Sequence, residues 1–128
     1  MIYPAFMVGL ALHFQPQLFD TSSAYGPAAR WFEESTWALL FFVIVALRLV
    51  ALIVNGTFAV FRWAPHIRLA VSILSAMAWS QLCFCFAILW IEDGRATFLT
   101  IMLSSAVLME IINAFRASRD LAEGGRVA

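Results

Sequence analysis

Long apolar stretches separated by short polar segments dominate the chain. Three of them, at about residues 35–54, 69–91 and 96–115, are each close to the roughly 20 apolar residues that a helix needs to cross a bilayer. The pattern predicts an all-α membrane protein with three strong transmembrane helices. We expect one integral domain over residues 1–128, ending in a short polar tail at 116–128.

A weaker apolar stretch opens the chain and permits two interpretations. Residues Ile2–Phe14 are apolar except for His13, and Gln15-Pro16-Gln17 follows them. One interpretation is a short first span at about residues 2–19, which we favour. The other is a helix that lies at the membrane interface, because about 20 apolar residues are normally needed for a span.

Turn-forming residues mark the boundaries between the predicted spans. Gly26-Pro27 lies in a polar segment, 20–30, which predicts a loop. Asn55-Gly56 is a typical helix stop. Pro65 interrupts residues 57–68, which we interpret as an interfacial connector, and a polar turn at 92–95 separates the last two spans.

The composition excludes a soluble fold. The chain is 63% hydrophobic and 12% charged, whereas soluble domains have about 45–50% apolar and about 25% charged residues. The bilayer is therefore the expected solvent. The formal net charge is +0, which gives no electrostatic reason to expect a nucleic-acid partner.

Arginine placement predicts the orientation. The positive-inside rule counts basic residues in the short segments between spans. One side of the predicted membrane has five arginines and the other has two: Arg62, Arg68, Arg116, Arg119 and Arg126 against Arg30 and Arg95. We therefore expect a cytoplasmic C-terminus. The expected interfacial anchors are Trp31, Trp37, Trp63, Trp90, Arg62, Arg68 and Arg116.

Two ionisable residues fall inside predicted spans. Such residues cost about 2.5–3.5 kcal/mol on insertion scales and are functional candidates. Arg48 lies six residues before Val54, and Glu110 lies six residues before Arg116. This matched depth predicts an ion pair, within one subunit or between subunits. The alternatives are that Arg48 reaches the headgroups while Glu110 is protonated, or that both belong to a proton or ion pathway.

Small and polar residues share helix faces with these charges. Asn55 lies on the face of Arg48, and Asn113 lies on the face of Glu110. Ser72, Ala76 and Ser80 form a small-residue stripe that suits close helix packing. We predict that the stripe mediates self-association; the alternative is packing within one chain against Ala96, Thr100 and Ser104. Gln81 lies on another face of the same helix, together with Leu74, Met77 and Cys85.

No catalytic pattern is evident. The sequence has no G-x-S-x-G, P-loop or H-E-x-x-H motif, and His13 and His66 lie in different segments. Cys83 and Cys85 lie two residues apart on a helix, which suits two buried thiols better than a metal site. We expect no enzymatic activity, cofactor or metal.

Three segments together resemble a group of small, uncharacterised membrane proteins of tailed phages and prophages of proteobacteria. They are Arg48–Gly56 (RLVALIVNG), Pro65–Arg68 (PHIR) with the later Leu74-Ser75, Trp79 and Gln81, and Glu110–Asp120 (EIINAFRASRD). The resemblance implies a bacterial inner membrane as the location. Members of the group more often have Asp where this chain has Glu110. The resemblance covers roughly residues 36–120 and implies no particular activity.

Small size, several spans and a charged tail favour a holin-like protein that oligomerises to permeabilise or remodel the cytoplasmic membrane. A second hypothesis is a non-lytic phage membrane factor, for superinfection exclusion or DNA entry, that binds another membrane protein. A host membrane subunit or small transporter fits less well, because the sequence shows no inverted repeat.

Overall fold

A computed structural model describes residues 1–21, 25–57, 63–93 and 98–124. The described part of the chain is helical and contains no strand, as the apolar pattern predicts. Its helices are α1 (Ile2–Phe14), α2 (Leu18–Thr21), α3 (Gly26–Ala29), α4 (Glu34–Thr57), α5 (Ala64–Asp93) and α6 (Phe98–Gly124).

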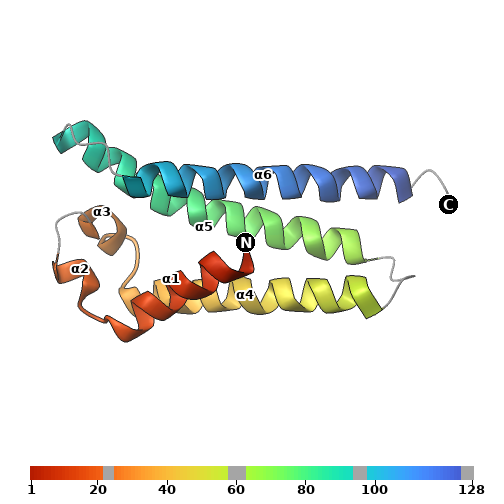
Figure 1. The fold of residues 1–128 in the computed structure, drawn as a ribbon, viewed down its shortest axis with the longest axis horizontal. Coiled ribbons are helices and arrows are strands. Elements are labelled where there is room, and N and C mark those ends of the chain that lie inside the picture. Colours follow the sequence, from red (N-terminus) through yellow and green to blue (C-terminus); the bar gives the residue numbers. More distant parts are fainter. Residues whose placement is uncertain (22–24, 58–62, 94–97, 125–128) are drawn as a thin grey trace.

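Three helices are long and apolar enough to cross a membrane. The candidate spans are Glu34–Val54 in α4, Ala64–Ile88 in α5 and Phe98–Glu123 in α6. α4 and α6 run in the same direction, and α5 runs between them in the opposite direction (Figure 1). The chain is therefore a membrane-spanning helical bundle, and the prediction of three strong spans is confirmed.

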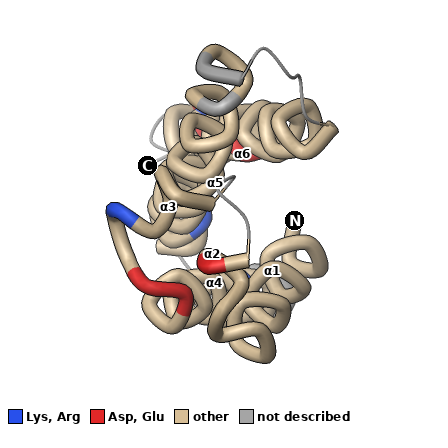
Figure 2. The backbone as a smooth tube through the Cα atoms, turned by 90° about the vertical axis from the view of Figure 1, so that its left-hand side faces the viewer, with Lys and Arg blue, Asp and Glu red and all other residues tan. Residues whose placement is uncertain are grey.

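The bundle is built from two helix pairs. α5 packs most extensively on α6, and α1 packs along α4, while the contact between α4 and α5 is smaller. Seen end-on, α5 and α6 lie on one side and α1 and α4 on the other (Figure 2). The short helix α3 lies against α5 near this end.

Two predicted boundaries were wrong. The connector predicted at 57–68 ends earlier, because α5 already begins at Ala64. Pro65 lies in the first turn of α5, where the missing amide hydrogen is not needed for a helical hydrogen bond. At the other end, α6 continues to Gly124, so most of the predicted polar tail is helical.

The N-terminal stretch does not form one continuous span to Phe19, which corrects our preferred interpretation. α1 ends at Phe14 and has 13 residues, which corresponds to about 20 Å, short of the roughly 30 Å hydrocarbon core. Gln15 and Pro16 are not helical, so they separate α1 from α2. The Phe19 amide then donates a 2.9 Å hydrogen bond to Glu34 Oε1 at the start of α4.

An aromatic cluster fills the core on the α2–α3 side of the bundle. Trp37 is 1% exposed, and its indole N–H donates a 3.2 Å hydrogen bond to the Ala28 carbonyl of α3. Its ring stacks on that of Phe41. The Phe41 ring in turn contacts the Trp79 ring edge-on, with 5.0 Å between the ring centroids. The prediction that Trp37 is a lipid-facing anchor was wrong, because α3 supplies the partner that the indole would otherwise seek at the interface.

The close approach of α1 to α4 depends on Gly9. A Cβ atom at Gly9 would lie 3.1 Å from the Phe42 ring. We expect Gly9→Leu to lower the free energy of unfolding in detergent by about 1–3 kcal/mol, the usual range for overpacking. The matched control is Ala11→Leu, because Ala11 is exposed on the same helix. Equal losses for both variants would show that α1 does not depend on close packing at Gly9.

Candidate functional site

The two charges inside the membrane meet in the bundle. α4 carries Arg48 and α6 carries Glu110. Arg48 Nη2 donates a hydrogen bond to Glu110 Oε2, so the two side chains form an ion pair. The Glu110 side chain is 0% exposed and that of Arg48 is 14% exposed. The predicted pair is thus present, and it forms within one chain.

Two further side chains complete the environment of Glu110. Ser75 of α5 donates its hydroxyl to Glu110 Oε1 at 2.9 Å. Asn113, one turn further along α6, donates its side-chain amide to Glu110 Oε2 at 3.3 Å. Both carboxylate oxygens therefore accept hydrogen bonds, and all three spans contribute a donor. We call Arg48, Ser75, Glu110 and Asn113 the Glu110 cluster.

The geometry of the Glu110 cluster suits a buried, charged pair. Removing two charges from water costs several kcal/mol per ion, and their attraction offsets this only when the remaining hydrogen-bonding positions are also satisfied. Glu110 meets that condition through Ser75 and Asn113. Arg48 meets it in part, because its Nε is buried without a hydrogen-bond partner in the described residues.

The Glu110 cluster also joins the two helix pairs. α4 packs on α1, and α6 packs on α5, whereas α4 and α6 make little direct backbone contact. The Arg48–Glu110 pair bridges that separation, and Ser75 ties the intervening helix to the same carboxylate. The arrangement can therefore fix the relative placement of the three spans.

Other polar residues predicted for this site lie elsewhere. Gln81 does not join the Glu110 cluster but lines a groove along α5 with Leu74 and Met77. The side chain of Asn55 lies outside the described residues, as does Ala96. Ser75 was part of the resembling segments but was not predicted to contact Glu110. The available signal was a second hydroxyl on the same helix, three residues after Ser72.

The small-residue stripe divides between two surfaces. Ser72 is buried and lines a cavity beside Arg48, whereas Ala76 and Ser80 line the groove along α5. The alternative, packing against Ala96, Thr100 and Ser104 within one chain, stays a prediction. The carbonyl of Thr100 lies 3.9 Å from Cys83 Sγ, and the Ser104 hydroxyl bonds to the Ile101 carbonyl of its own helix.

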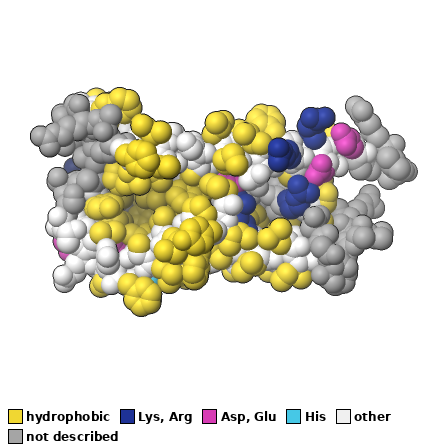
Figure 3. Space-filling view, in the orientation of Figure 1, with side chains coloured by type: hydrophobic (Ala, Val, Ile, Leu, Met, Phe, Trp, Pro, Cys, Tyr) yellow, Lys and Arg dark blue, Asp and Glu magenta, His cyan; other side chains and the backbone are white. Residues whose placement is uncertain are grey.

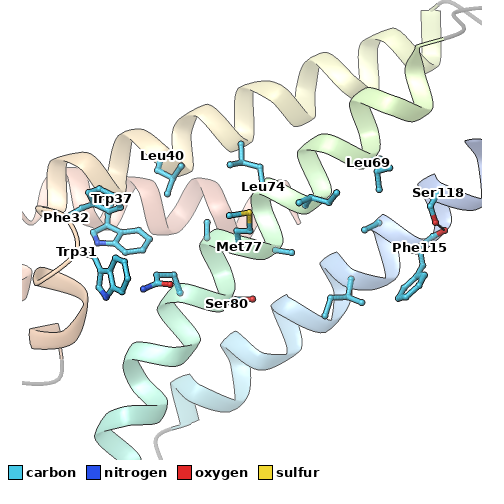
Figure 4. A pocket seen from close by; sticks show the side chains of 16 residues that line it. Trp31, Phe32, Trp37, Leu40, Leu69, Leu74, Met77, Ser80, Phe115 and Ser118 are labelled. Carbon is cyan, nitrogen blue, oxygen red and sulfur yellow. Dashed lines mark hydrogen bonds between the residues drawn. The ribbon is translucent and has the colours of Figure 1, made fainter.

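A wide groove runs along α5. It has a volume of about 750 Å³, and its walls come from the start of α4, from α5 and from α6. Trp31 and Trp37 lie at one end, and Phe115 and Ser118 lie at the other (Figure 4). Its lining is predominantly apolar, so in a bilayer lipid or another helix must fill it.

The side chains predicted as interfacial anchors differ in their exposure. Trp31, Trp63 and Trp90 are 59%, 61% and 48% exposed, as lipid-facing or interfacial side chains should be. Arg68 pairs with Asp120 at 2.8 Å near the exposed end of the bundle, and Arg116 is exposed. Asp120 was not singled out from the sequence. Arg62 lies outside the described residues.

Comparison with protein-family models, curated proteins and solved structures finds no match. The function therefore has to be inferred from the groove, the Glu110 cluster and the arginines of this chain.

Proposed function

We propose that the protein is a phage-type small membrane protein that associates with copies of itself to permeabilise or remodel the cytoplasmic membrane of a bacterium, as holins do. The observation that carries this proposal is the apolar groove along α5, with Ala76 and Ser80 among its lining residues. Small residues allow a second helix to approach closely, which is how membrane helices gain dispersion contacts without a hydrophobic driving force.

A second copy is the occupant that the proposal requires. One chain has three candidate spans, and buried Glu110 and its partners lie between them. We infer that a bundle with three candidate spans permeabilises a membrane only as several copies. α6 offers a helix face for a neighbour's groove, because Ile101, Met102, Leu108 and Met109 are exposed and apolar.

Timed expression in bacterial cells tests this function. We expect an abrupt loss of membrane potential after a delay, followed by lysis, because a hole forms only once enough copies have assembled. A voltage-sensitive dye and culture turbidity provide the measurements. Insertion without loss of potential at any expression level would contradict the proposal.

A second candidate is a non-lytic phage membrane factor that uses the groove to bind a different membrane protein. The observation that favours it is that both carboxylate oxygens of Glu110 accept hydrogen bonds from side chains of the same chain. Resistance of expressing cells to phage infection, with membrane potential intact, would support this candidate over the first.

The proposed orientation places the C-terminus in the cytoplasm, from the arginine count. We expect a phosphatase that is active only in the periplasm to be inactive when fused after Ala128, and a fluorescent protein at the same position to be fluorescent. The two reporters control for each other, because loss of expression would silence both. Phosphatase activity without fluorescence would reverse the orientation.

A further inference from the structure

A second cavity lies beside the Glu110 cluster, on the side toward the start of α5. It has a volume of about 380 Å³, within the usual range of small-ligand sites, about 300–1,000 Å³. Every charged side chain that lines it is an arginine: Arg48, Arg68 and Arg116. On the face seen in Figure 3, arginine side chains gather at this half of the molecule, beside the apolar half.

The acids that balance these arginines do not line the cavity. Glu110 pairs with Arg48, and Asp120 pairs with Arg68. Arg116 forms no ion pair with an acid among the residues that the structure describes. The Nε atom of Arg48 is also buried and has no hydrogen-bond partner among the described residues. The cavity thus has an excess of positive charge, and Arg116, which is exposed and lines it, is the arginine left to bind a ligand.

The remaining lining residues complement this charge. Ser72 and Asn113 add a hydroxyl and an amide, and Ala51, Leu52 and Val71 form an apolar wall. Guanidinium groups bind phosphate oxygens through paired hydrogen bonds, and basic pockets between membrane helices hold lipid headgroups. We propose that this cavity binds a phosphate group, carried either by an anionic phospholipid headgroup or by free phosphate.

Retention of lipid by the purified, full-length protein tests the proposal. The probes are phosphatidylglycerol and, as the zwitterionic comparison, phosphatidylcholine, measured by native mass spectrometry. We expect preferential retention of phosphatidylglycerol, weakened about tenfold by Arg116→Gln, as loss of one charged hydrogen bond implies. The matched control is Arg119→Gln, because Arg119 is exposed on the same helix but does not line the cavity.

A second arm distinguishes the source of the phosphate. Inorganic phosphate is compared with chloride at equal ionic strength for its effect on the thermal stability of the protein in detergent. Stabilisation that Arg116→Gln abolishes, without selective lipid retention, would identify free phosphate as the ligand. If Arg116→Gln and Arg119→Gln weaken both measurements equally, or neither changes them, the cavity is not a phosphate site. These readouts require neither self-association nor permeabilisation, so the proposed function is tested separately.

Discussion

Replacing either Arg48 or Glu110 by alanine is expected to lower the free energy of unfolding by about 3–5 kcal/mol, the usual cost of breaking a buried ion pair. Without Arg48, the fully buried Glu110 keeps only Ser75 and Asn113 as partners. Without Glu110, Arg48 loses its only ion-pair partner among the described residues. Unfolding of the purified protein in mixed detergent micelles measures both losses.

The double variant Arg48→Ala/Glu110→Ala is expected to cost less than the sum of the single variants, because both charges are removed together. Residues in contact usually show interaction energies of about 0.5–3 kcal/mol. The Arg68–Asp120 pair provides a matched control, since its side chains are 36% and 45% exposed. Exposed pairs contribute about 0–1 kcal/mol. Additive losses for Arg48 and Glu110 would show that the pair does not form in the membrane.

The Arg48–Glu110 pair was predictable because two simple facts sufficed. Both residues lie in apolar spans that run in the same direction, and each lies six residues before the expected membrane end. Helical rise converts equal spacing into equal depth, and an unpaired charge at that depth is expensive. The prediction held even though α6 extends to Gly124, beyond its expected end.

The partners of this pair could not be predicted in the same way. Whether Ser72 or Ser75 faces Glu110 depends on the rotation of α5 about its axis, which the sequence leaves undetermined because most faces of that helix are apolar. The structure places Ser75 on the carboxylate and Ser72 on the arginine-lined cavity. The prediction for Trp37 was wrong for a related reason. Its position near the end of a span indicated the interface, and only the folded chain brings the Ala28 carbonyl within hydrogen-bond distance of its indole.

Self-association through the groove leads to the second large expected effect. Ala76 lines the groove and is partly buried. A leucine there would fill the space and hold a second helix away, without making the span less apolar. We expect Ala76→Leu to insert normally but to associate at least about tenfold more weakly, since overpacking costs about 1–3 kcal/mol and tenfold corresponds to about 1.4 kcal/mol.

The control for this expectation is Ala46→Leu, which adds the same volume at an exposed position of α4, away from the groove. Cross-linking in membranes and native mass measurement should show the wild-type oligomer for Ala46→Leu and a loss of it for Ala76→Leu. Loss of membrane potential on expression should follow the same order, because a permeabilising assembly requires several copies.

An unchanged oligomer in Ala76→Leu would show that the groove is not the subunit interface and would leave lipid or a different protein as its occupant. A wild type that is monomeric in lipid would contradict the holin-like function itself.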